Sequence, residues 1–316
     1  MSSINTNMAA MTALQTLTQT NKSLLETQSR ISTGFRVAEA SDNAAYWSIA
    51  TTMRSDKGAL STVQDALGLG ASVVDVAYTA VNSAIDVVNQ IKTKLVAARE
   101  PGIDKTKVQS EITELQKQLK SIADAASFSG ENWLSVDSTP ATFNATKNVV
   151  SGFTRTGSVV AVQTIAIDTS GMDLFDANVG TADANAGILD GKRVAAGTIA
   201  EATGTFSIYG LSISALSDST ADITTLNSYI SGADAGIKEM TTVAGSLGAV
   251  KSRIGLQQDF VKGLMNALDR GISSLVDADM NEESTRLQAL QVKQQLGIQA
   301  LGIANSSSQN ILRLFQ

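Results

Sequence analysis

The chain of 316 residues has no cysteine and no histidine, only 2 prolines, and 4% aromatic residues. Without cysteine or histidine it cannot carry a Ser-His-Asp triad, a cysteine nucleophile, or the usual zinc and haem ligands. Disulfides are excluded too, so cysteine usage gives no information on the redox compartment. The acidic balance, 30 acidic against 24 basic residues, argues against electrostatic binding of nucleic acid. We predict no enzyme activity, no cofactor and no metal site.

Charge is also scarce at the start of the chain, where the first charged side chain is Lys22. A secretory signal has a basic start followed by an apolar run. The start here is rich in Ser, Thr, Asn and Gln, so we predict no such signal. The uncharged stretch 294–312 is interrupted by the polar residues 306–310, and no other run is apolar enough to span a bilayer. We therefore expect no membrane-spanning segment.

Apolar or small residues recur three and four positions apart over 60–95, a spacing typical of a heptad seam in a long helix. The small residues Gly70, Ala77 and Ala84 would let a partner helix approach closely. Pro101-Gly102 ends this helix, and a second apolar stripe over 108–126 predicts the return arm of a helical hairpin. The spacing returns over 247–275, where Gln257 is expected to fix the register. The predicted bundle seam comprises Leu60, Val63, Leu67, Val74, Val81, Val88, Ile91, Leu95, Leu115, Leu119, Ile254, Val261, Leu264 and Leu268.

The helical spacing is lost between about 136 and 221, where Thr, Ser, Gly, Ala, Asp and Asn dominate. Short β-branched runs at 159–162 and 164–167, and apolar-polar alternation at 206–209 and 211–213, predict strands. Four basic residues stand against eight acidic ones in this segment, so most of the net charge of −6 lies there. The predicted fold is mainly α: a long coiled-coil-like helical hairpin formed by the N- and C-terminal segments, with a small β-rich outer domain inserted in the middle.

The two ends of the chain are alike, because both are amphipathic, almost uncharged and rich in amides and hydroxyls. Burying such ends against copies of themselves would desolvate few charges, whereas an isolated helix of this kind is marginal in water. We expect ends that become ordered on assembly. The predicted self-assembly residues of this inner core are Ile4, Met8, Met11, Leu14, Leu17, Leu24, Ile31, Leu296, Leu301, Ile311, Leu312, Leu314 and Phe315.

Four short motifs have functional alternatives that we consider weaker than structural ones. Gly187–Arg193 is similar to a phosphate loop but one residue short, so an ordinary turn is favoured. Asp277 and Asp279 are favoured as a helix start over a calcium site. Tyr46-Trp47 is favoured as a packing anchor at a junction over a binding surface. Asp42 is expected to cap a helix.

The motifs at both ends resemble those of bacterial flagellins over residues 1–135 and 222–316. They are Ser3-Ile4-Asn5-Thr6-Asn7, Ile31-Ser32-Thr33-Gly34-Phe35-Arg36-Val37, Ala40-Ser41-Asp42-Asn43-Ala44-Ala45, Leu247-Gly248-Ala249-Val250-Lys251-Ser252-Arg253-Ile254, Val276-Asp277-Ala278-Asp279, and Ala304-Asn305 through Leu312-Arg313-Leu314-Phe315. The middle departs from the family, as its variable outer domain does. Asn43 with Tyr46-Trp47 is similar to variants of soil alphaproteobacteria. The same residues, and Lys92 and Lys94, depart from the pattern of the segments that plant and animal flagellin receptors sense.

The resemblance implies a structural subunit that polymerises into the flagellar filament, the helical propeller of swimming motility, by coaxial packing of its terminal helices. It implies inner-core helices at 1–44 and 276–316, a bundle shell at 45–135 and 222–275, and a surface-exposed outer domain at 136–221. The implied location is the extracellular flagellum after type III export. The implied partners are the chain itself and sister flagellins, the export chaperone and apparatus, the filament cap, hook-junction proteins and host immune receptors, with no nucleic acid and no membrane.

Two alternatives stay open at this point. A hook–filament junction protein would share the end motifs but join or cap rather than build a long fibre. A module that coats membranes or lipid granules would also use amphipathic ends, although their polar faces are rich in amides and hydroxyls instead of Lys and Arg.

Overall fold

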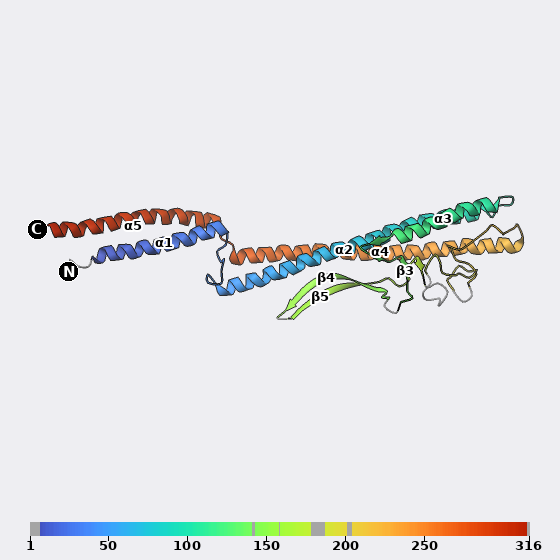
Figure 1. The fold of residues 1–316 in the computed structure, drawn as a ribbon, viewed down its shortest axis with the longest axis horizontal. Coiled ribbons are helices and arrows are strands. Elements are labelled where there is room, and N and C mark those ends of the chain that lie inside the picture. Colours follow the sequence, from blue (N-terminus) through green and yellow to red (C-terminus); the bar gives the residue numbers. More distant parts are fainter. Residues whose placement is uncertain (1–6, 141–142, 158, 178–186, 201–203, 315–316) are drawn as a thin grey trace. The chain divides into compact units, whose positions relative to one another are not determined.

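The computed structural model describes residues 7–140, 143–157, 159–177, 187–200 and 204–314, with only the backbone given for 307–314. The elements of this part of the chain are, in order, α1 (Met8–Thr33), α2 (Ala44–Ala97), α3 (Lys105–Ala125), β1 (Ser127–Phe128), β2 (Glu131–Asn132), β3 (Ser135–Val136), β4 (Thr146–Thr156), β5 (Val159–Asp168), β6 (Phe175–Asp176), α4 (Thr220–Val276) and α5 (Met280–Leu314). Helices dominate and the strands lie mid-chain (Figure 1), which confirms the predicted fold class.

The chain forms two compact units, one of Met1–Gly58 with Leu264–Gln316 and one of Ala59–Gly263. The boundary between them falls inside α2 and α4, each of which contributes to both units. The mid-chain insert belongs to the second unit and does not form a compact body of its own. The three-part division expected from the sequence therefore remains a proposal about the assembled state.

Polar caps set the helix ends. Asn7 caps α1, and Gly34 ends it in the left-handed conformation, with φ of 75°, that glycine adopts at little cost. The Asn43 side chain accepts from the N–H groups of Ala45 and Tyr46 and so caps α2. The expectation that Asp42 supplies this cap is wrong, because its carboxylate accepts from two N–H groups of the preceding loop instead.

In the second unit α2 and α4 run antiparallel, and α3 folds back along α2. Lys92 pairs with Asp234 and Lys94 with Glu111, both at 2.5 Å. The α2 seam residues Leu60, Val63, Leu67, Val74, Val81, Val88, Ile91 and Leu95 are all at most 5% exposed, as are Leu119, Ile254 and Val261. Leu115 is half-buried, as are Leu264 and Leu268, which belong to the first unit. Since a fully buried Val or Leu side chain contributes about 1.5–3 kcal/mol, this seam is the main source of stability.

Gly70 was expected to let a partner helix approach, but it packs against a strand residue instead. A Cβ placed there would lie 2.4 Å from Val149 Cγ1, so the glycine makes room for a strand residue of the insert and not for a helix. The buried face of α3 also differs from the apolar stripe predicted over 108–126, because it includes the polar residue Gln116. Its side-chain amide donates to the carbonyls of Ile208 and Leu211, both at 3.1 Å.

The insert is only partly β-structured. The runs at 159–162 and 164–167 both lie in β5, which pairs antiparallel with β4, so the strand predicted there is confirmed. The strands expected at 206–209 and 211–213 are wrong, since the structure shows turns and a single bridge at Phe206. Their alternation has another cause. Phe206, Ile208, Leu211 and Ile213 are buried, while Gln116 takes carbonyls that a strand ladder would have used.

The β4–β5 hairpin is held on α4 by polar side chains at an irregularity of its ladder. The register shifts between Val150 and Gly152, which leaves Ser151 without a partner across the hairpin. Gln257 Nε2 donates to the Ser151 carbonyl at 2.8 Å, and Arg253 donates to a β5 carbonyl, that of Ala166, at 3.1 Å. The expected role of Gln257 in helix register is therefore replaced by a role in seating the hairpin.

Replacing Gln257 by alanine should lower the free energy of unfolding of the second unit by about 1 kcal/mol, the usual contribution of one hydrogen bond. Urea unfolding followed by Trp133 fluorescence in a Trp47→Phe background measures this change, because Trp133 is buried in the second unit. Gln258→Ala, one residue further along α4, should stay within about 0.5 kcal/mol. Equal losses for both variants would contradict the seating role.

In the first unit the two connections between helices lie against each other and form a small core. The amides of Arg36 and Val37 donate to the Val276 carbonyl, and Ala278 N donates to Gly34 O at 2.9 Å. Val37 and Val276 are buried with Ala50 and Ile272, and Phe35, Met53 and Leu275 pack against this group. The connections are therefore ordered by their own contacts within this unit.

One helix, α2, contains an 18-residue stretch that is long and apolar enough, by composition, to cross a membrane. The expectation that no run qualifies is therefore wrong. A helix buried in a protein core has the same composition, and α2 carries the buried seam of the second unit. The seam spacing, with polar residues between the buried positions, accounts for the composition of this helix.

Candidate self-assembly surfaces

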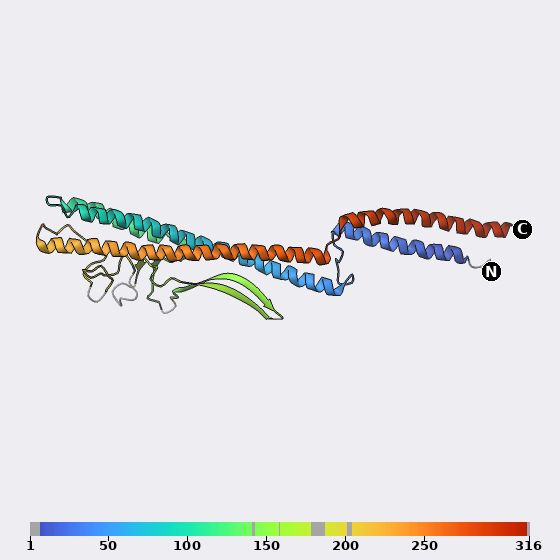
Figure 2. The ribbon, with the colours of Figure 1, turned by 180° about the vertical axis from the view of Figure 1, so that it is seen from behind.

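The helices α1 and α5 lie side by side and antiparallel in the first unit, as Figures 1 and 2 both show. Three polar contacts among the described residues join the two helices. Asn7 Nδ2 donates to the Ala304 carbonyl at 2.9 Å and Gln294 Nε2 donates to Asn21 Oδ1 at 2.8 Å. Arg30 Nη1 donates to Glu283 Oε1 at 3.1 Å. Two side-chain amide contacts and one ion pair thus align the two helices.

The structure divides the predicted inner-core residues into two sets. Leu24 is buried, and Leu17, Ile31 and Leu301 are half-buried. Met8, Met11, Leu14 and Leu296 are instead 54–69% exposed. Ile4 and Phe315 lie outside the described residues, and Ile311, Leu312 and Leu314 lie in α5 where side chains are not described. One part of the predicted set therefore joins α1 to α5, and another part faces outward.

Further apolar side chains continue this outward face. Leu25 is 66% exposed, Val292 55%, and Ile303 69%. None of these three is in the predicted set, although the spacing on α5 carried a signal. Val292, Leu296 and Ile303 follow at four and seven positions, which places them on one side of α5. The pair α1–α5 thus presents apolar surface that the chain itself does not cover.

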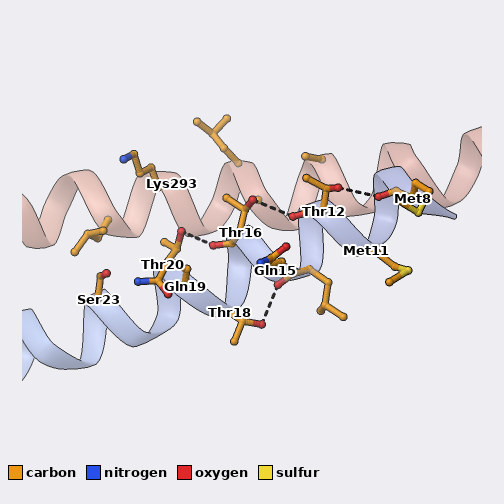
Figure 3. Close-up of a pocket in the computed structure, with 15 residues that line it drawn as sticks. Met8, Met11, Thr12, Gln15, Thr16, Thr18, Gln19, Thr20, Ser23 and Lys293 are labelled. Atoms are coloured by element: carbon orange, nitrogen blue, oxygen red, sulfur yellow. Dashed lines mark hydrogen bonds between the residues drawn. The ribbon is translucent and has the colours of Figure 1, made fainter.

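A groove of about 1160 Å³ lies along α1 and α5, and Figure 3 shows its lining. Thr12, Thr16 and Thr20 stand in a row on α1, and each hydroxyl donates at 2.9 Å to the carbonyl four residues earlier. Because these donors are satisfied within the helix, a second helix packed over them would leave none of them unpaired. The threonine-lined face of α1 can therefore be buried against another helix without losing hydrogen bonds.

The aromatic pair at the start of α2 does not pack as expected. Tyr46 is 42% and Trp47 37% exposed, so the prediction of a junction packing anchor is wrong for this chain alone. Phe35 takes that place, with the Arg54 guanidinium 5.0 Å from its ring centroid. Phe35 follows the left-handed glycine that ends α1, and this turn directs the chain into the small core.

The motifs weighed for ligand binding have structural roles. Asp279 Oδ1 accepts from the N–H of Asn281 at 2.9 Å, as expected for a helix start. Among the described residues no group of three or more acidic side chains is arranged to hold a metal ion. Gly187–Arg193 begins with a turn closed by the Gly191 N–H on Gly187 O, and Arg193 is fully buried. The ordinary turn is therefore confirmed over the phosphate loop.

The ends of the chain match known sequences. Residues 4–139 match the bacterial flagellin N-terminal helical region, and residues 230–315 match the bacterial flagellin C-terminal helical region. Among similar proteins, Flagellin C of Rhizobium meliloti (strain 1021) is 50% identical over the full length of both chains. The chain belongs to the bacterial flagellin family. Flagellin A of the same strain is 46% identical and a flagellin of Brucella melitensis biotype 1 is 45% identical, again over the full length of both chains.

Membership of this family gives the role of the surfaces described above. The chain is a structural subunit of the bacterial flagellar filament, which serves motility, and it assembles with copies of itself and with sister flagellins. Its place is the extracellular part of the flagellum. Since a filament is built from repeated copies, apolar surface that is bare on one copy is available to the next.

Proposed function

We propose that the chain polymerises through the outward apolar faces of α1 and α5, which pack against the same helices of neighbouring copies. The observation that carries this proposal is the 54–69% exposure of Met8, Met11, Leu14 and Leu296, which lie in stretches of α1 and α5, 8–21 and 294–312, without a charged side chain. Exposed apolar patches of this extent are interaction surfaces more often than they are solvated. The contact is heterologous, so it grows and does not close.

The finer parts of the assignment belong to the same proposal. Residues 1–44 and 276–316 form the inner core of the filament, 45–135 and 222–275 the surrounding shell, and 136–221 the outer surface. Subunits reach the filament tip by type III export, with an export chaperone, the filament cap and hook-junction proteins as partners. Host immune receptors remain candidate partners, and the role of the chain is mechanical, without catalysis.

A charge on each outward face should abolish polymerisation without unfolding the subunit. In Leu14→Glu with Leu296→Glu, assembly would bury two carboxylates without partners, which is strongly unfavourable. The monomer should change by less than about 0.5 kcal/mol because both sites are exposed. Negative-stain electron microscopy of seeded growth should show short seeds only.

Gln118→Glu is the matched control, because it places the same charge on an exposed position of α3. This variant should extend seeds like the unaltered chain. Long filaments from the Leu14→Glu and Leu296→Glu double variant would contradict the proposal. Seeds that stay short even with the unaltered chain would favour the junction or capping role.

A further inference from the structure

The turn at 187–191 connects several segments of the insert through backbone hydrogen bonds. On one side its amides bind the preceding segment: Ile188 N donates to Asp173 O at 3.0 Å and Leu189 N to Leu174 O at 2.9 Å. On the other side its carbonyls accept from Tyr209 N at 2.8 Å, through Leu189 O, and from Arg193 Nη2 at 2.7 Å, through Ile188 O. A displacement of this turn would therefore alter the hydrogen bonds to 173–174 on one side and to Tyr209 and Arg193 on the other.

Arg193 continues the connection to the helices. Its guanidinium also donates to Gly197 O at 2.7 Å and forms a two-pronged pair with Glu239 of α4, at 3.1 and 2.6 Å. The side chain of Arg193 is fully buried. The turn thus lies between the interior of the insert and the ion pair that seats the insert on α4.

Carboxyl groups gather on the interior side of this turn. Asp190 Oδ2 accepts from the Asp176 amide at 3.0 Å, while Asp190 Oδ1 is buried and has no hydrogen-bond partner within the described part of the chain. Burial raises the pKa of Asp190 to about 6, with the charges of Asp173 and Asp176 adding to the rise. Burial likewise raises the pKa of Asp173 to about 6, and Asp176 adds to it.

Two cations near these carboxyls, those of Lys120 and Arg193, have other carboxylates as partners. Lys120 of α3 reaches over the Phe175 ring at 5.0 Å but pairs with Asp124 at 2.7 Å. Arg193 pairs with Glu239, and Lys192, on the segment after the turn, is exposed. None of these three cations is among the causes that set the pKa of Asp173 or Asp190. Within the described part of the chain, the charges that act on these two pKa values are those of Asp173 and Asp176, and both raise them.

We propose that Asp173 and Asp190 form a proton-dependent latch, which holds the turn and the seat of the insert on α4 more tightly in mildly acidic medium than above neutrality. When both groups ionise, two half-buried negative charges lie near a third at Asp176, and the buried Oδ1 of Asp190 has no hydrogen-bond donor in the described part of the chain to stabilise its charge. The proposal concerns the subunit itself and does not depend on how copies pack.

The direction follows from linkage. A carboxyl whose pKa is raised on folding binds its proton more tightly in the folded state, so its contribution is complete below the unfolded pKa of 3.8 and is lost as pH rises through about 6. The chain has no histidine, so no imidazole titrates in this window. The Asp234 carboxyl behaves oppositely. Lys238 of the same helix and Lys92 of α2 lower its pKa to about 2, so its contribution is lost only in strong acid.

Amide hydrogen exchange of the full-length monomer at about pH 5 and about pH 7.5, expressed as protection factors, tests the latch. The amides of Ile188, Leu189 and Tyr209 should be up to about tenfold more protected at the lower pH for each carboxyl that titrates. Amides of the α2 seam, such as that of Val81, should keep the same protection. Equal or lower protection of the turn at the lower pH would overturn the proposal.

Asp190→Asn should remove the share of this pH dependence that Asp190 contributes and raise the protection of the turn at about pH 7.5, because the neutral amide carries no charge to bury. Asp173→Asn tests the same pair if the first variant does not fold. Asp168→Asn is the matched control in the insert, since this exposed carboxyl has its pKa lowered by the Ser170 hydroxyl. A pH dependence that keeps its full size in both test variants would also overturn the proposal.

Discussion

Replacing Glu239 by alanine is expected to destabilise the second unit by about 3 kcal/mol, more than any other single change considered for this chain. Arg193 is fully buried, and Glu239 supplies the charge that compensates its guanidinium, through contacts of 3.1 and 2.6 Å. Removing the carboxylate leaves a buried positive charge whose remaining acceptors, in the described part of the chain, are the carbonyls of Ile188 and Gly197. The cost of an uncompensated buried charge exceeds that of a lost surface pair.

Urea unfolding followed by Trp133 fluorescence, in the Trp47→Phe background, measures this loss. Glu114→Ala is the control, because the Glu114–Lys117 pair on α3 is exposed at both partners and should contribute less than about 1 kcal/mol. A Glu239→Ala variant that unfolds at the same urea concentration as Glu114→Ala would contradict the anchoring role of Arg193.

Alanine at Gly70 should give a less stable protein than alanine at Gly68. Both glycines lie in α2, where alanine is favoured by about 1 kcal/mol on helix propensity alone. A Cβ at Gly68 meets nothing within 4 Å, so Gly68→Ala should gain that amount. A Cβ at Gly70 meets Val149 Cγ1 at 2.4 Å, and the stiff β-branched side chain cannot turn aside. Overpacking of this kind costs about 1–3 kcal/mol and offsets or reverses the gain.

A double-mutant cycle separates the two contributions to the Gly70 effect. Val149→Ala removes the two methyl groups that the new Cβ would meet, so Gly70→Ala should be less harmful in that background. The same fluorescence-detected urea unfolding measures all four variants. If Gly70→Ala and Gly68→Ala stabilise equally in the unaltered chain, the hairpin is not seated on α2 through this contact.

The helical part of the fold was predictable because its determinants are local. The spacing from Leu60 to Leu95 specifies a buried face whatever the partner is, and Pro101-Gly102 marks the end of the helix before α3. The seat of the insert was not predictable, because it rests on contacts between residues far apart in sequence. Gln116 binds the carbonyl of Ile208, and Arg193 binds Glu239. No local pattern indicates which polar side chain will find a buried partner.

The sequence showed which segments form the assembly surfaces, but only in part which of their side chains face outward. Uncharged amphipathic ends indicated burial, but they did not show which side chains α1 and α5 would use on each other. Leu24 is buried in this pair, whereas Leu14, with the same chemistry, is 54% exposed. The difference follows from position around the helix relative to α5. Tyr46 and Trp47 illustrate the converse, since large aromatic side chains suggested a packing anchor and the chain leaves them exposed.

Methionine oxidation in monomer and filament tests most directly whether the outward faces of α1 and α5 are the polymerisation surfaces. Met8 is 69% and Met11 59% exposed in the single chain, so dilute peroxide should convert both to sulfoxides in the monomer. Met240, which is fully buried, is the internal reference. In seeded filaments Met8 and Met11 should become as resistant as Met240, while the half-buried Met172 of the insert keeps its monomer rate. Oxidation of Met8 and Met11 at the monomer rate in intact filaments would contradict the account.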